Sequence, residues 1–86
     1  MVQKRYHELP AVERDAFEAA CGRHGFVADD FEVSVKEDAA TARRIINVGR
    51  IVGSQFGQYA TADGIAWVAL FERDLAGDAF GFPLAD

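Results

Sequence analysis

The chain has 86 residues, of which 50% are apolar and 27% are charged, with one cysteine and a formal net charge of −5. A chain of this length buries one core of two packed layers, which excludes a cofactor domain beside a separate substrate domain. Its aromatic and aliphatic content excludes a disordered tail. Its longest unbroken apolar run, Ile65 to Phe71, is far shorter than the ~20 residues of a membrane helix. We expect one globular domain over residues 1–86 and no membrane segment.

The compartment and source are indicated only by composition. The first 25 residues carry charge throughout and hold no apolar stretch ahead of a cleavage site, so we expect no secretion signal. Cys21 has no second cysteine to pair with, which favours a reducing, cytoplasmic environment. Seven Arg against two Lys, together with fifteen Ala, suggest a GC-rich bacterial genome.

The first helix is predicted over residues 10–24. A helical wheel places its apolar side chains on one half, around Val12: Leu9, Val12, Ala16, Phe17, Ala19, Ala20 and Cys21. Pro10 suits the first turn, where a missing N–H has no helical partner. Gly25 suits the position just past the C-terminus of the helix, where a residue in the left-handed conformation ends it. Phe26 can then pack against the last helical turn.

Three strands are predicted after this helix. Phe31, Val33 and Val35 alternate with polar residues, which is typical of a half-buried strand. A second strand runs through residues 45–48, which are rich in β-branched side chains, and a third is expected at about residues 54–60. The sequence leaves open which side chains share a face of the second strand beyond Gly49. A bulge there turns Arg50 to the face of Arg43 and Asn47, whereas a regular strand puts Arg44 and Arg50 on the Ile46–Val48 face.

A second helix is predicted over residues 63–76, capped at its start by Thr61 or Asp63 and stopped by Gly77. One helical stripe holds Trp67, Val68, Phe71 and Leu75, and Trp67 is the expected anchor of the core. The tail from Asp78 carries Phe80 and Phe82, which either pack as an ordered loop or form an exposed aromatic end.

These elements together predict an α+β two-layer sandwich of α-β-β-β-α order, in which two helices cover one face of a three-stranded antiparallel sheet. Double-stranded RNA-binding domains have the same element order. The lysines that open their last helix have no counterpart in Asp63, Gly64 and Ile65, so we assign no family.

Charge is distributed unevenly along the chain. Residues 39–62 hold three arginines and no acid, for a charge of +3, whereas the other residues hold fourteen acids and six bases, for −8. Arg43, Arg44 and Arg50 with Phe56 and Tyr59 are therefore the candidate binding residues. Such a basic β-surface is one hypothesis for nucleic-acid binding, because phosphates bind cations and bases stack on aromatic rings. The alternative is that these arginines pair with acids across the sheet.

Catalysis, metal binding and cofactor binding are all disfavoured by the sequence. Cys21 and His24 are one turn apart, but they lie in the last helical turn, where the helix dipole disfavours a thiolate. With His7 they make at most three scattered metal ligands, without the paired spacing of a zinc site. No motif for a cofactor is found. The sequence therefore favours a small, non-catalytic binding or regulatory module that engages a protein partner or a second copy of itself.

Overall fold

The computed structural model describes residues 2–38, 40–53, 55–61 and 64–81. Four strands, two α-helices and two short 3₁₀ turns follow one another along the chain. Their order is β1 (Val2–Arg5), η1 (Tyr6–Glu8), α1 (Ala11–Arg23), η2 (Ala28–Asp30), β2 (Phe31–Asp38), β3 (Arg43–Arg50), β4 (Phe56–Thr61) and α2 (Ala66–Ala76).

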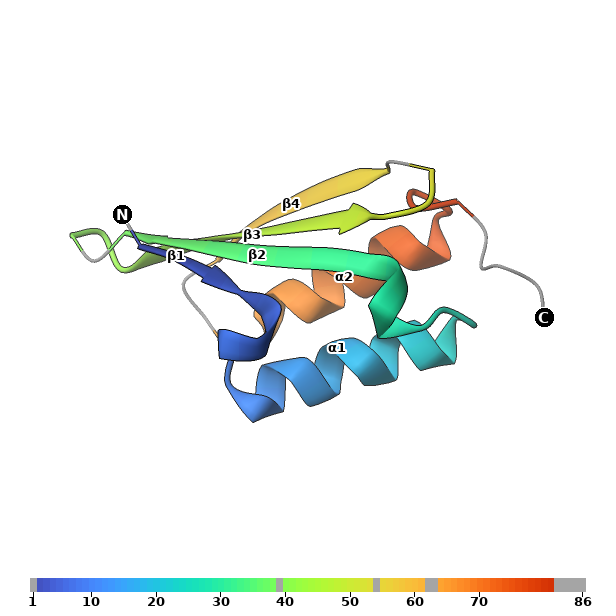
Figure 1. The fold of residues 1–86 in the computed structure, drawn as a ribbon, viewed down its shortest axis with the longest axis horizontal. Helices are drawn as coiled ribbons and strands as arrows, with labels where there is room; N and C mark the ends of the chain where they lie inside the picture. The colour runs from blue at the N-terminus through green and yellow to red at the C-terminus, as the bar shows by residue number, and fades with distance from the viewer. Residues whose placement is uncertain (1, 39, 54, 62–63, 82–86) are drawn as a thin grey trace.

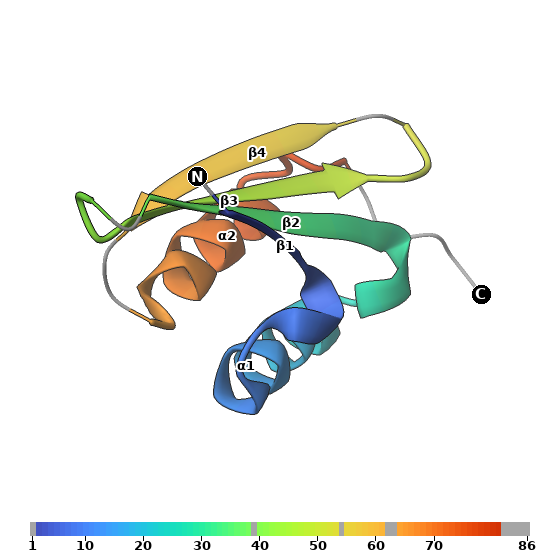
Figure 2. The same ribbon diagram turned by 60° about the vertical axis from the view of Figure 1, so that its left-hand side comes forward.

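The four strands form one antiparallel sheet in the order β1-β2-β3-β4, and both helices lie on the same face of it (Figures 1 and 2). The α+β class with two helices on a meander is therefore confirmed. The prediction of three strands and of a helix as the first element is wrong, because β1 precedes α1 and pairs with Ser34–Glu37 of β2. Only Val2 is apolar in β1, so this edge strand gives no period-two signal.

Helix α1 buries part of its predicted apolar half, but it is turned toward Glu13. Phe17, Ala20 and Cys21 are buried as predicted, whereas Glu13 is buried as well and Val12 is 62% exposed. The helix is turned because the carboxylate of Glu13 finds buried hydrogen-bond donors and thus lies inward. The predicted end is observed: Gly25 has a left-handed φ of 79°, and the N–H of the buried Phe26 donates to the Cys21 carbonyl at 2.9 Å.

Strand β3 is regular throughout its length. It pairs with β2 without interruption from Asp38↔Arg43 to Phe31↔Arg50, so the second of the two predicted phases is the one observed. Residues with even numbers in β3 therefore face the helices. In β4 the residues with odd numbers face the helices. Tyr59 is therefore buried, whereas Phe56 is 64% exposed.

Gly57 of β4 lies against Phe80 in the segment after α2. A Cβ atom at this position would lie 2.7 Å from the Tyr59 hydroxyl oxygen and 2.9 Å from Cζ of Phe80. Both distances are shorter than real Cβ contacts, so the packing of Phe80 under the sheet requires a glycine here.

The core is an aromatic cluster between the sheet and the helices. Trp67, Phe17 and Phe71 are fully buried, and the Phe17 and Phe71 rings lie 4.8 Å apart, which confirms Trp67 and the α2 stripe as core. Helix α2 begins at Ala66 with Ile65 as its N-cap, not at the predicted caps: Thr61 ends β4 and Asp63 lies outside the described residues.

The end of the described chain also contributes to the core. Gly77 caps α2 as predicted, and Phe80 beyond it is 1% exposed. Phe80 therefore packs as part of an ordered loop, whereas Phe82 lies outside the described residues.

Candidate functional site

The five predicted binding residues do not share one surface. Arg43 and Phe56 are exposed on the face of the sheet that carries no helix. Arg43 lines a small cleft of about 240 Å³ there, with Lys36 and Asp38. The remaining three, Arg44, Arg50 and Tyr59, lie on the helix-facing side. A coherent basic and aromatic patch is thus absent from the described part of the sheet.

Arg44 forms a buried polar clamp with both helices. Its Nη2 donates to Oε1 of Glu13 at 2.7 Å, and Nε1 of Trp67 donates to the same oxygen at 2.9 Å. The Glu13 side chain is only 4% exposed and that of Arg44 is 16% exposed. The Glu13 carboxylate of α1 is therefore joined to β3 by the charged donor of Arg44 and to α2 by the neutral donor of Trp67. A buried carboxylate needs such donors because it has lost its hydrogen bonds to water.

Arg50, at the other end of β3, is buried without a carboxylate partner among the described residues. Its Nη1 donates to the Phe80 carbonyl at 2.7 Å, and its Cζ lies 5.0 Å from the centre of the Phe26 ring. Its Nε and Nη2 have no hydrogen-bond partner, and neither does Oε1 of the neighbouring Gln55. These three atoms at this end of the sheet thus have no hydrogen-bond partner within the described part of the protein.

Tyr59 is tied to α2 and presents no ring to solvent. Its hydroxyl donates to Oδ2 of Asp74 at 2.7 Å, and burial, then the hydrogen bond to Asp74, raises the pKa of Tyr59 above its ordinary value. The Tyr59 ring is therefore a part of the core and not a stacking surface.

Cys21 and His24 point to separate environments. Cys21 is fully buried, and this burial raises the pKa of its thiol to about 12. His24 instead places Nε2 3.0 Å from Oε2 of Glu72, the same carboxylate that accepts two hydrogen bonds from Arg23 at 2.7 Å. The hydrogen bond from Arg23 lowers the pKa of Glu72 to about 2.

No group of three or more His, Cys, Asp and Glu side chains among the described residues is placed to hold a metal ion. None of the described helices is long and apolar enough to cross a bilayer.

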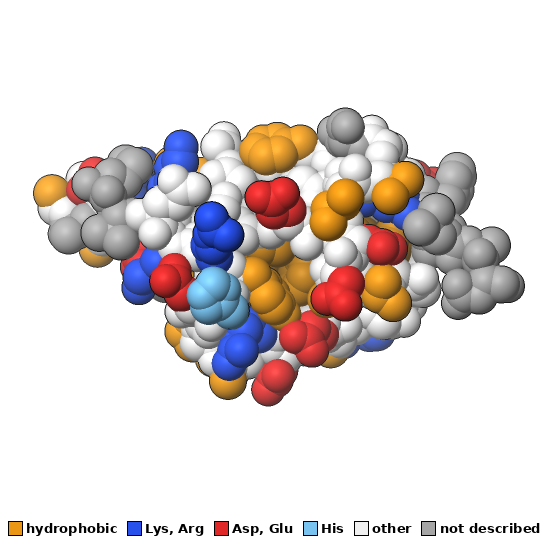
Figure 3. Space-filling view, in the orientation of Figure 1, with side chains coloured by type: hydrophobic (Ala, Val, Ile, Leu, Met, Phe, Trp, Pro, Cys, Tyr) orange, Lys and Arg blue, Asp and Glu red, His pale blue; other side chains and the backbone are white. Residues whose placement is uncertain are grey.

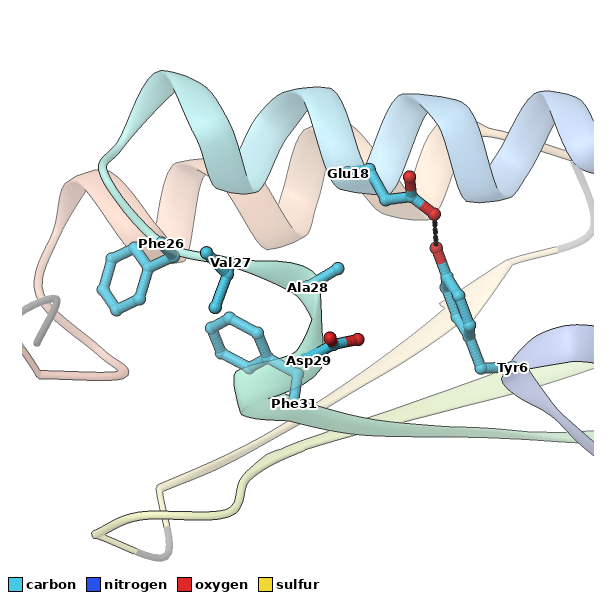
Figure 4. Close-up of a pocket in the computed structure, with 7 residues that line it drawn as sticks. All are labelled: Tyr6, Glu18, Phe26, Val27, Ala28, Asp29 and Phe31. Atoms are coloured by element: carbon cyan, nitrogen blue, oxygen red, sulfur yellow. Dashed lines mark hydrogen bonds between the residues drawn. The ribbon is translucent and has the colours of Figure 1, made fainter.

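An open cleft of about 510 Å³ lies where η1, α1 and η2 meet. Seven residues line it: Tyr6, Glu18, Phe26, Val27, Ala28, Asp29 and Phe31. Figure 4 shows the Glu18 carboxylate reaching down from α1 to the hydroxyl of Tyr6, while Asp29 extends from η2 toward the same space. In Figure 3 hydrophobic side chains form the bottom of a hollow on this face, with acidic side chains gathered along one side of it.

The chemistry of this cleft is aromatic and acidic. The Tyr6 hydroxyl donates to Oε2 of Glu18 at 2.6 Å, and burial, followed by this hydrogen bond, raises the pKa of Tyr6. Glu18 and Asp29 are both exposed, and no Lys, Arg or His is among the lining residues. Three aromatic rings and two carboxylates around one space make a site that suits a cation.

A second cleft, of about 470 Å³, continues from the first and shares Tyr6 and Phe31 with it. It follows β2 past the point where β1 ends, since Arg5 is the last residue of β1 and pairs with Ser34. Residues 31–33 of β2 therefore have a strand neighbour only on the β3 side. An open strand edge beside a cleft is the feature that binds extended peptide segments in other proteins.

Sequence reasoning misses this site because its residues come from three separate segments. Tyr6 follows a strand without a hydrophobic pattern, Glu18 is on the polar side of the predicted helix, and Asp29 reads as an ordinary loop residue. Only the three-dimensional arrangement brings them together. The one signal in the sequence is the excess of acids outside residues 39–62, and this excess does not distinguish Glu18 and Asp29 from the other acids.

Comparison with known proteins does not add to this description. No protein-family model, no curated protein and no solved structure matches the chain. The function is therefore argued from the geometry of the molecule.

Proposed function

We propose that this chain is a non-catalytic protein-binding module that seats a Lys or Arg side chain of a partner protein in the cleft of Tyr6, Glu18 and Asp29. The observation that carries the proposal is the convergence of two exposed carboxylates on a space with an aromatic floor and no basic lining residue. A cation there gains charge-assisted hydrogen bonds from the carboxylates and a favourable contact with the ring faces.

The surroundings of the cleft support a partner in extended conformation. The second cleft leads from Tyr6 along the open edge at residues 31–33, where a peptide backbone can pair with β2. Such pairing supplies affinity that does not depend on side chains, and the acidic cleft supplies the selection for a basic residue. The net charge of −5 further favours the approach of a basic partner.

The absence of catalysis in this proposal is supported by the state of the sole cysteine. Cys21 is buried, and the pKa of its thiol is raised to about 12, so the thiol stays protonated at neutral pH and is a poor nucleophile. The cleft itself holds two carboxylates and a tyrosine, and Glu18 is engaged by the Tyr6 hydroxyl.

The proposal is tested with fluorescein-labelled ten-residue peptides that are identical except for one central Arg, Lys, citrulline or Glu. We expect measurable anisotropy changes for the Arg and Lys peptides and weaker ones for citrulline and Glu, with affinity that falls as salt is raised. Glu18→Gln and Asp29→Asn should each weaken binding of the Arg peptide by about two- to fivefold. Glutamine at position 18 can still accept from Tyr6, so the cleft keeps its shape.

The matched control is Asp15→Asn, which removes an exposed acid of α1 that does not line the cleft. It should leave affinity for the Arg peptide unchanged apart from a small effect of net charge. Equal binding of the Arg and citrulline peptides, or equal loss in the Asp15 and Glu18 variants, would contradict the proposal.

A further inference from the structure

The two edges of the sheet are protected to different degrees. Edge strand β1 has four residues and carries Lys4 and Arg5. Edge strand β4 has six residues, and the chain from Ile51 to Ala62 contains no charged residue and no proline. Soluble proteins ordinarily protect exposed edges with charges, prolines or very short strands, because an unprotected edge pairs with another chain.

Large apolar side chains are exposed on this unprotected strand and in the turn that precedes it. Phe56 of β4 is 64% exposed, and Val52 of the turn is 55% exposed. Both Figure 1 and Figure 2 show β4 at the edge of the sheet opposite β1. Two molecules that each carry a charge of −5 repel each other over most of their surfaces, so a neutral segment is where a second copy meets least repulsion.

The direction of the outward backbone groups follows from one hydrogen bond. The N–H of Arg50 donates to the carbonyl of Gln55 at 2.7 Å, and hydrogen-bonded pairs alternate with non-bonded pairs along an antiparallel ladder. The next pair, Gly49↔Phe56, is therefore non-bonded. Phe56, Gln58 and Ala60 thus direct their N–H and C=O groups away from β3, along the open edge.

We infer that the chain forms a twofold-symmetric dimer in which β4 pairs antiparallel with β4 of a second copy. In one register, the outward N–H and C=O groups of Phe56, Gln58 and Ala60 all form hydrogen bonds. This register places Gln58 opposite Gln58 of the second copy, and Phe56 opposite Ala60 of the second copy. Each such pair exchanges two backbone hydrogen bonds. The two sheets become one continuous sheet, with all four helices on the same side, and the large Phe56 ring packs over the small Ala60. This surface is separate from the acidic cleft, so the inference does not depend on the proposed function.

The test measures the mass of the full chain by sedimentation equilibrium at concentrations up to about 1 mM, the range in which a small interface associates. We expect the mass to rise from the 9.4 kDa of one chain to twice that value. Gln58→Lys places two like charges together at the twofold axis and should weaken association by about tenfold or more. Gln3→Lys makes the same change at an exposed glutamine of the opposite edge strand and should leave association unchanged.

Charge complementation tests the register itself. Gln58→Glu alone should also associate more weakly than the wild type, whereas an equimolar mixture of Gln58→Lys and Gln58→Glu should form a mixed dimer, because the two side chains then face each other with opposite charge. Circular dichroism of each variant checks that the exposed substitution leaves the fold intact. A wild-type chain that stays monomeric to 1 mM, or a Gln58→Lys variant that dimerises as well as the wild type, would overturn the inference.

Discussion

Strand β3 carries one arginine at each end of its helix-facing side, and the two are treated differently by the fold. The Arg44 guanidinium meets the Glu13 carboxylate at 2.7 Å, and Trp67 completes the cluster. The Arg50 guanidinium is more deeply buried, yet it has one carbonyl partner and two nitrogens without any. One end of the sheet is thus a satisfied polar clamp, and the other holds a buried charge with an incomplete set of partners.

The two ends of β3 also differ in what lies beside them. The Arg44 clamp joins both helices to the sheet. The Arg50 end adjoins the acidic cleft: Phe26 contacts Arg50 and also lines the cleft, and Phe31 pairs with Arg50 in the register. The proposed binding cleft therefore lies next to the arginine that has fewer hydrogen-bond partners within the protein.

The largest effect is expected from the Arg44 end. Arg44→Met leaves the Glu13 carboxylate buried without its counter-charge, so it should lower the free energy of unfolding by about 3–5 kcal/mol, measured by urea denaturation. The double variant Glu13→Gln with Arg44→Met should recover part of this loss, because no buried charge then remains. A loss of less than about 1 kcal/mol for Arg44→Met, small for a broken buried pair, would show that the clamp does not stabilise the fold.

The same substitution at the other end should have a much smaller effect. Arg50→Met removes a hydrogen bond to the Phe80 carbonyl and a contact with the Phe26 ring, but it also removes two buried donors that have no partner. These contributions oppose each other, and we expect a change of about 1 kcal/mol or less in the free energy of unfolding. A loss as large as that of Arg44→Met would remove the contrast between the two ends.

The reactivity of Cys21 reports local unfolding near the Arg50 end of β3. The Cys21 carbonyl accepts the N–H of Phe26, and the Phe26 ring contacts Arg50. Burial raises the pKa of the thiol to about 12, so alkylation of the native protein at pH 7 should be slower than that of a free thiol by about a hundredfold or more. Mass spectrometry of the adduct over time measures this rate, with the urea-unfolded chain as the control. Rapid stoichiometric labelling of the folded chain would instead support a reactive thiol.

The smallest effect is expected from the exposed cluster between α1 and α2. The hydrogen bond from Arg23 lowers the pKa of Glu72 from 4.5 to about 2. Because the carboxyl pKa is lower in the folded chain, its ionisation stabilises the fold fully at pH values above the pKa of the unfolded chain. This stabilisation is lost as the pH falls from there through about 2, the pKa in the folded chain. The wild type should therefore melt slightly higher than Glu72→Gln at pH 6, and the difference should vanish near pH 2. A difference that grows as the pH falls would contradict the assignment.

The sequence predicts the parts of the fold that repeat regularly. The alternation at Phe31, Val33 and Val35 and the stripe of Trp67 and Phe71 both follow from one-dimensional periodicity, and both are observed. The apolar pattern of α1 likewise predicts the burial of Phe17, Ala20 and Cys21, but it does not predict that Glu13 lies inward. The burial of Glu13 depends on partners that are 31 and 54 residues away in the chain.

The candidate site illustrates the same limit more strongly. The local charge of residues 39–62 makes Arg43, Arg44 and Arg50 candidate binding residues, with a shared face for Arg43 and Arg50 only if β3 is bulged. The regular β3 instead divides the three arginines between two faces. The acidic cleft, in contrast, joins side chains from η1, α1 and η2. None of these segments has a motif, so the cleft is found only once the chain is folded.

The proposed division between a stabilising end and a binding end is tested most directly by a titration followed residue by residue with ¹H–¹⁵N NMR, using the Arg-centred ten-residue peptide. We expect the amide shifts of Tyr6 and residues 27–33 to change with the peptide concentration, while those of Glu13 and Arg44 stay unchanged. Shifts centred on Arg43 and Phe56, or no saturable shifts at all, would contradict the proposed division.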